Sequence, residues 1–175
     1  MASVVLVIGG ECTGKTALAQ ALADHLIGLP VSVVSETLRE FVSRTGRTPR
    51  RDEQEGIWRE QARLLDDALS DSPDQGLVIC DPAPLMTAVY SLQYFGDDSL
   101  LERALAAITS RDVVVWCAPD IPWEPDGVQR DGPHARQRTH ELITERVVPR
   151  IHHARLVQVT GDLDDRLAQT LTHLP

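Results

Sequence analysis

The sequence predicts an α/β protein in which a parallel β-sheet is covered by helices on both faces. Short apolar runs alternate with segments of helical periodicity along the whole chain. The first apolar run leads directly into a glycine-rich loop. With 175 residues, of which 42% are hydrophobic, the chain can bury a substantial core. We therefore expect one domain over residues 1–175.

Five runs have the composition of buried parallel strands, because they are short, apolar and rich in β-branched residues. They are residues 3–8, 31–35, 77–81, 113–117 and 156–160. Helices on both faces of such a sheet give a three-layer α/β/α sandwich. Ligands of sheets of this kind bind beyond the carboxyl ends of the strands.

Seven further segments place apolar residues at helical spacing. They are residues 15–27, 36–45, 52–70, 84–95, 99–109, 135–153 and 162–173. Residues 118–133 differ from these, because they contain four prolines and two glycines and show no periodicity. We interpret residues 118–138 as a lid over the site, with a plain connection as the alternative.

The loop after the first strand, residues 9–16, matches the phosphate-binding pattern G-x-x-x-x-G-K-[ST]. Its Lys15 is the only lysine of the chain. In such a loop, backbone N–H groups bind the β- and γ-phosphates, and the final hydroxyl binds Mg²⁺. The motif predicts ATP binding with Thr16 on the metal; the residues expected at the nucleotide are Gly9, Gly10, Glu11, Cys12, Thr13, Gly14, Lys15, Thr16 and Ala17.

The net charge and the cysteine content exclude several other classes of function. A net charge of −9 argues against a nucleic-acid partner, which would require a basic face. The three cysteines are isolated, so we expect neither a disulfide framework nor a zinc site. No targeting or membrane segment is visible. We expect a cytoplasmic protein that acts on a small molecule, and the sequence does not indicate an oligomeric state.

Asp81 follows four apolar residues at the end of the third strand, which is the Walker-B pattern. This position predicts an aspartate beside the Mg²⁺ of the phosphate loop, and a helix cap for the next segment is the alternative. Pro82 and Ala83 follow, without the second acidic residue that polarises water in ATP-hydrolysing machines. The pattern therefore favours a kinase over an ATPase.

Glu36 follows the second strand, where the acceptor of a phosphate-loop kinase is expected. It is our candidate for the general base or the anchor of the acceptor hydroxyl. Arg39 lies one helical turn further on and is expected to face the same site. A surface ion pair between the two side chains is the alternative.

The lid segment brings three arginines, Arg130, Arg136 and Arg138, of which Arg130 is the first candidate for a catalytic role. Lid arginines of small-molecule kinases stabilise charge on the transferring phosphoryl group. We expect Arg136 to bind the nucleotide together with the phosphate loop. Pairs with Glu141 and Glu145 on a helix surface are the alternative for Arg136 and Arg138.

Two tryptophans and two glutamines complete the candidates. Trp58 and Trp123 could stack on a planar ligand ring, or pack in the core. Gln54 and Gln61 flank Trp58 on the expected helix 52–70 and could bind an acceptor, or be solvated.

Four segments resemble the ribosylnicotinamide kinase domain of the NadR proteins, a phosphate-loop kinase within the AAA-like ATP-binding proteins. They are residues 9–16, 35–42, the strand end at Asp81, and residues 122–130. The family pattern is Gly-Gly-Glu-Ser-Ser-Gly-Lys, then Trp-Glu-Tyr-x-Arg-Glu, then Asp-Thr-Asp, then Trp-x-x-Asp-Gly-x-Arg. The order and approximate spacing agree along nearly the whole chain.

The resemblance implies the kinase strand order 2-3-1-4-5, ATP and Mg²⁺ as cofactors, and phosphorylation of a nucleoside 5′-hydroxyl in NAD biosynthesis. It places Lys15 and Thr16 at the phosphates, Glu36 and Arg39 at the acceptor, Asp81 near the metal, and Asp126 and Arg130 in the lid. Three departures affect the acceptor site: Ser35 and Thr37 replace aromatic residues, and Pro82-Ala83 replaces Thr-Asp. No His-x-Gly-His adenylyltransferase signature is present, so we expect phosphorylation alone.

The sequence thus predicts an ATP-dependent kinase of a small hydroxylated metabolite, with a nucleoside such as nicotinamide riboside as the leading acceptor. Lys15, Glu36, Asp81 and Arg130 are the expected catalytic residues, and either Glu36 or Asp81 is the base. The expected acceptor-site residues are Glu36, Arg39, Trp58, Asp81 and Asp126. Two alternatives stay open, a nucleotide switch or ATPase that acts through a protein partner, and a nucleotide-binding protein without catalysis.

Overall fold

A computed structural model describes residues 2–124 and 132–174 and confirms the predicted fold class. Five parallel strands form one sheet in the order β2-β3-β1-β4-β5, the expected kinase order. The strands are β1 (Ser3–Ile8), β2 (Val31–Val34), β3 (Leu77–Cys80), β4 (Val113–Cys117) and β5 (Arg155–Val159). All five lie where the apolar runs predict them, to within one residue at either end.

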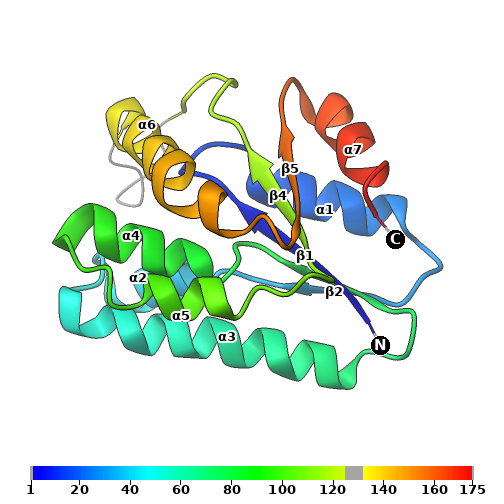
Figure 1. The fold of residues 1–175 in the computed structure, drawn as a ribbon, viewed down its shortest axis with the longest axis horizontal. Coiled ribbons are helices and arrows are strands. Elements are labelled where there is room, and N and C mark those ends of the chain that lie inside the picture. The colour runs from blue at the N-terminus through cyan, green and yellow to red at the C-terminus, as the bar shows by residue number, and fades with distance from the viewer. Residues whose placement is uncertain (1, 125–131, 175) are drawn as a thin grey trace.

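Helices cover both faces of the sheet (Figure 1). The helices α1 (Lys15–His25) and α7 (Leu163–Leu171) pack side by side on one face. On the other face lie α3 (Gln54–Asp71), α4 (Leu85–Phe95), α5 (Leu101–Ala106) and α6 (Pro133–Leu142). The helix α2 (Thr37–Thr45) and the short 3₁₀ turn η1 (Arg51–Glu53) connect β2 to α3. No helix of the described residues combines the length and apolar character needed to cross a membrane.

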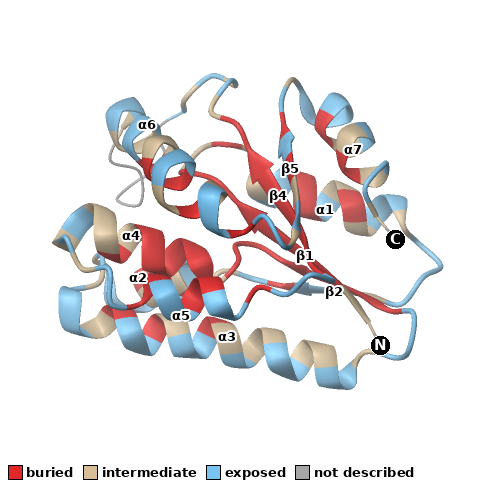
Figure 2. Ribbon diagram, viewed as in Figure 1, coloured by how far each residue is buried: buried red, intermediate tan, exposed pale blue. Residues whose placement is uncertain are grey.

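A hydrophobic core lies on each face of the sheet. The strand β1, at the centre of the sheet, contributes side chains to both cores. Val5 and Val7 face the core under α1 and α7, whereas Leu6 and Ile8 face the core under α3 to α6. Successive strand side chains point to opposite faces, so a strand covered on both sides is apolar at every position. Figure 2 shows this continuous burial along the central strands. The buried strand β1 carries the phosphate loop at its carboxyl end.

The expected helix 135–153 is wrong in its extent. It is continuous only over α6, then widens into a π-helical turn, Ile143–Val147, and ends in a 3₁₀ turn, Val148–Arg150. Pro149 has no backbone N–H and cannot continue the α-helical hydrogen bonds. The expected helix 99–109 is likewise shorter, since α5 covers six residues.

Candidate active site

The loop of residues 9–14 joins β1 to α1 with a backbone that requires glycine at both ends. Gly9 has φ +145°, and a Cβ there would lie 2.8 Å from Thr13 Oγ1 and 2.9 Å from the Cys117 carbonyl. Gly14 is the N-cap of α1 and has φ +76°, in the left-handed region. The two glycines therefore bend the chain tightly enough for α1 to begin at Lys15.

The interior of the loop is held by its own side chains. Lys15 Nζ donates to the Gly10 carbonyl at 2.7 Å, and Thr13 Oγ1 donates to the same oxygen at 2.8 Å. The first N–H groups of α1 point out of the helix end, where the helix dipole favours an anion. The strand, loop and helix arrangement that the motif requires is thus present.

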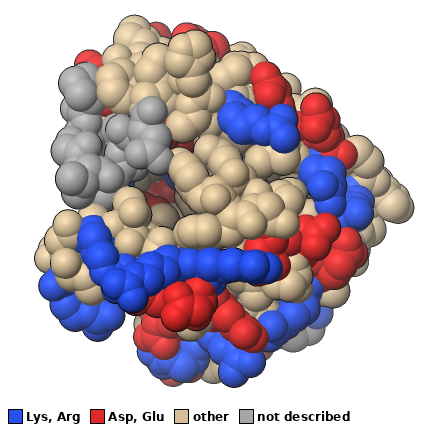
Figure 3. Space-filling view, turned by 90° about the vertical axis from the view of Figure 1, so that its left-hand side faces the viewer, with Lys and Arg blue, Asp and Glu red and all other residues tan. Residues whose placement is uncertain are grey.

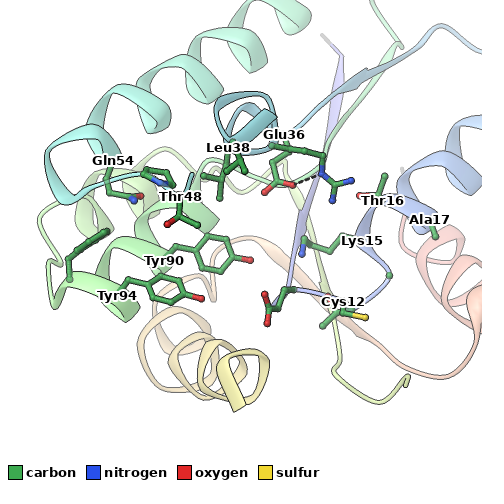
Figure 4. Close-up of a pocket in the computed structure, with 17 residues that line it drawn as sticks. Cys12, Lys15, Thr16, Ala17, Glu36, Leu38, Thr48, Gln54, Tyr90 and Tyr94 are labelled. Atoms are coloured by element: carbon green, nitrogen blue, oxygen red, sulfur yellow. Dashed lines mark ion pairs between the residues drawn. The ribbon is translucent and has the colours of Figure 1, made fainter. Parts of the chain in front are cut away.

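A cavity of about 520 Å³ extends from this loop toward the C-terminal end of α4 (Figure 4). One end holds Lys15, Thr16, Glu36 and Cys12, and the other holds Thr48, Gln54, Tyr90 and Tyr94. The described residues that line it are Glu11, Cys12, Thr13, Gly14, Lys15, Thr16, Ala17, Glu36, Leu38, Arg39, Val42, Thr48, Pro49, Gln54, Tyr90, Tyr94 and Phe95. The cavity therefore joins the predicted nucleotide residues to the predicted acceptor residues Glu36 and Arg39.

Glu36 lies at the N-cap of α2, and its carboxylate lines the cavity. Burial raises the pKa of Glu36, against the opposing effects of Lys15 and Arg39, and Asp81 raises it further. Glu36 forms an ion pair with Arg39 at 3.5 Å, and the side chains are 20% and 53% exposed (Figure 4). The pair that we considered as a surface alternative therefore forms, but at the cavity.

Asp81 lies immediately after β3, and its side chain is buried. Its N–H donates to the Val34 carbonyl at 2.9 Å, which ties this strand end to β2. Its Oδ1 is buried and accepts no hydrogen bond from any described residue. The N-cap of α4 is Pro84 and no side chain caps this helix, so Asp81 does not act as a helix cap. Asp81 is not among the residues that line the cavity.

The rings at the cavity come from α4 and not from Trp58. Tyr90, Tyr94 and Phe95 line its far end, with the two tyrosine rings 6.3 Å apart. Burial raises the pKa of Tyr90 well above its usual value, so its hydroxyl stays protonated. Sequence reasoning missed these residues, although Tyr90 and Tyr94 share one face of a helix that was expected there. The structure places Trp58 against the core, with the Arg103 guanidinium 4.5 Å from its ring centroid.

The described residues predicted in the lid do not gather at one site in the structure. Asp126 and Arg130 lie outside the described residues. Arg136 reaches the phosphate loop and donates to the carbonyls of Cys12 at 3.1 Å and Ile121 at 2.8 Å. Arg138 is exposed and pairs with Glu141 at 3.3 Å, as in the surface alternative. Trp123, the other tryptophan candidate, is partly buried and does not line the cavity.

Arg166 is a residue of α7 that sequence reasoning missed, because it lies outside every motif. Its side chain is 2% exposed. It donates to the carbonyls of Thr13 at 2.5 Å, Ala118 at 3.1 Å and Gly161 at 2.8 Å, and pairs with Asp120. One guanidinium therefore joins the phosphate loop to the segments that follow β4 and β5.

Both signs of charge occur on the side of the molecule shown in Figure 3, where Lys and Arg side chains lie next to Asp and Glu side chains. Near the N-terminus of α3, Arg51 pairs with Asp97 at 2.9 Å and Arg47 pairs with Glu53 at 2.7 Å. Arg47 and Arg51, which do not line the cavity, are each paired with a carboxylate.

Comparisons with known proteins agree with this architecture. The model of the AAA domain family matches residues 4–166. Thymidylate kinase from Candida albicans has a TM-score of 0.67 at 13% identity, with 98% of this chain and 90% of that chain covered. Deoxyadenosine kinase from M. mycoides has a TM-score of 0.65 at 11% identity, with 97% of each chain covered. No curated protein matches the sequence significantly.

A NadR protein in complex with NR has a TM-score of 0.69 at 21% identity. The match covers 98% of this chain and 51% of the NadR chain, so the present sequence spans about half of that protein. At these identities the likeness establishes the fold, which is that of phosphate-loop kinases. Because the family model covers most of the sequence, the chain belongs to the AAA domain family.

Proposed function

We propose that this protein is an ATP-dependent kinase that phosphorylates a hydroxyl group of a small metabolite, with a nucleoside such as nicotinamide riboside as the first acceptor to test. The observation that carries the proposal is the continuous cavity from Lys15 and Thr16 to Glu36 and the rings of α4. A kinase requires such a shared space, because the acceptor must meet the γ-phosphate in line.

The nucleotide end fits ATP and Mg²⁺. The N–H groups at the start of α1 and the Lys15 ammonium supply positive charge for the β- and γ-phosphates. Oδ1 of Asp81, to which no described residue donates a hydrogen bond, and the Thr16 hydroxyl are oxygen donors of the kind that Mg²⁺ prefers. When bound, the metal neutralises developing charge on the phosphates. Mg²⁺ at nucleotide sites keeps several waters, so few protein ligands are sufficient.

The acceptor end fits a nucleoside better than a nucleotide. The far end of the cavity is lined by Thr48, Gln54, Tyr90, Tyr94 and Phe95, which carry no charge at neutral pH. Planar rings stack on aromatic side chains, and the Gln54 amide can both donate and accept hydrogen bonds. The phosphate group of a nucleotide acceptor would require additional cations at this end of the cavity. The NadR protein of similar fold binds NR, which supports the same choice of first substrate.

In the proposed reaction, the acceptor hydroxyl lies against the Glu36 carboxylate, which accepts its proton as the oxygen attacks the γ-phosphorus. The bond to the bridging oxygen of ADP breaks in the same displacement. Lys15 stabilises the charge on the phosphoryl oxygens. Arg136 holds the loop through the Cys12 carbonyl. Arg39 orients Glu36 through their ion pair.

The test is a coupled assay of ADP formation with purified protein, ATP and Mg²⁺. The panel contains nicotinamide riboside, ordinary nucleosides, a nucleoside monophosphate and shikimate, and mass spectrometry identifies the product. We expect acceptor-dependent ADP formation and a phosphorylated nucleoside. Fast ADP formation without any acceptor would support the switch or ATPase alternative. Bound nucleotide without a product across the whole panel would contradict the proposal and support a silent nucleotide binder.

A further inference from the structure

Gln61 binds the backbone on both sides of Glu36. It lies on α3, and its side chain is buried, with 2% exposed. Its Oε1 accepts hydrogen bonds from the N–H and the hydroxyl of Thr37, each at 2.8 Å. Its Nε2 donates to the Ser35 carbonyl at 3.0 Å. The orientation of the amide is fixed, because a backbone N–H can only donate and a carbonyl can only accept.

The same amide also touches the strand that carries Asp81. Gln61 Nε2 lies 3.6 Å from Cys80 Sγ, at the end of β3. One side chain thus connects the chain around Glu36 to the residue before Asp81. It is not one of the residues that line the cavity, so it does not meet a substrate there.

Gln61 also satisfies the start of α2 from a different helix. The Glu36 side chain at the N-cap bonds none of the first N–H groups of α2. The Thr37 N–H, the first of them, donates to Gln61. The Glu36 carboxylate lies at the cavity beside Arg39.

We propose that Gln61 is a positioning residue that holds Glu36 in its reactive place. This inference rests on the proposed function. Removal of the amide leaves the N–H of the buried Thr37 without this partner and frees the Ser35 carbonyl, so the two peptides around Glu36 rearrange to find other partners. A small displacement of a reacting group is sufficient to slow an in-line transfer strongly.

Gln61→Met tests the inference, because it keeps the length of the side chain and removes all its hydrogen bonds to the chain around Glu36. We expect kcat to fall by about 10²-fold, whereas the KM for ATP stays unchanged because the phosphate loop is untouched. Gln61→Asn, whose amide is one methylene too short to reach both peptides, is a second variant with the same expected direction. Leu65 lies on the same helix and packs against the core, so Leu65→Ala is the control for a general loss of packing.

The decisive comparison is the double variant Glu36→Gln with Gln61→Met. If Gln61 acts through Glu36, the double variant is no slower than Glu36→Gln alone. Multiplied losses would overturn the inference. An unchanged kcat in Gln61→Met or Gln61→Asn would also overturn it. The same holds if Leu65→Ala lowers kcat as much as Gln61→Met does at the same decrease in Tm. A wild-type protein without kinase activity would remove the proposed function and the inference together, whereas an active wild type with an unaffected Gln61→Met variant removes the inference alone.

Discussion

Lys15 is the residue on which the proposed nucleotide binding depends most directly. Its ammonium lies at the loop interior on the Gly10 carbonyl, and it stands at the first position of α1. We expect Lys15→Ala to abolish both ATP affinity and turnover, because no other lysine exists in the chain. Isothermal titration with ATP and the coupled assay measure the two effects. Retention of both affinity and turnover would show that the loop is not the nucleotide site.

Glu36 is the proposed base at the acceptor end of the cavity. Glu36→Gln keeps the shape of the side chain and removes its capacity to take a proton. We expect turnover to fall by about 10²-fold or more, with ATP binding preserved because the phosphate loop is intact. Steady-state kinetics and titration with ATP separate the two quantities. Unchanged turnover would exclude Glu36 as the base and leave Asp81 as the candidate.

Burial of Glu36 also has a consequence for stability. Its folded-state pKa is raised, so between its usual value of 4.5 and the higher folded value the native protein holds a proton that the unfolded chain releases. Its contribution to stability is therefore lost as pH rises through this window. We expect Glu36→Gln to raise Tm relative to wild type at neutral pH, and to raise it less at about pH 4. Thermal unfolding at the two pH values measures the difference. A larger gain at the acidic pH would contradict the pKa direction.

At the scale of elements, α7 supports the phosphate loop through Arg166. Its guanidinium holds the Thr13 carbonyl, one residue before the N-cap of α1. Hydrogen bonds of a charged group typically contribute about 1.5–3 kcal/mol each. We expect Arg166→Met to lower both Tm and ATP affinity.

The exposed Arg155 on β5 provides the control for Arg166. Its side chain donates to the His173 carbonyl and does not touch the loop. Arg155→Met should therefore leave ATP affinity unchanged, as measured by titration. Equal losses of affinity in the two variants would show that Arg166 has no specific effect on the loop.

Elements that depend on local sequence were predicted well. The strand β1 is apolar from Val4 to Ile8 and the loop after it needs glycine, so both follow from the order of residues. The prediction of one helix over residues 135–153 is wrong beyond α6. The periodicity of apolar residues does not reveal where a helix widens or where a proline ends it. The position of Trp58 could not be inferred either, since core packing and ring stacking require the same side chain.

At the scale of the whole molecule, binding of nucleotide should stabilise the fold. The loop and Arg166 come from distant parts of the chain and are in contact only in the folded protein, so a ligand bound at the loop favours the folded state. MgATP at a hundredfold excess over its Kd should add about 2.7 kcal/mol. Differential scanning fluorimetry measures this as a rise in Tm. We expect a smaller rise with EDTA and none in Lys15→Ala; a full rise in Lys15→Ala would place the nucleotide elsewhere.

The sequence by itself determined the fold class, the position of every strand, the phosphate loop with Lys15, and the strand ends at Glu36 and Asp81. These features are encoded locally, as runs of apolar residues and as glycines at fixed positions. Only the tertiary structure decided that Tyr90 and Tyr94 provide the rings of the cavity, that Arg166 holds the loop, and that Gln61 binds around Glu36. The physical reason is that each of these contacts joins segments far apart in the chain, and a single sequence does not record which distant carbonyl or N–H group a buried side chain will reach.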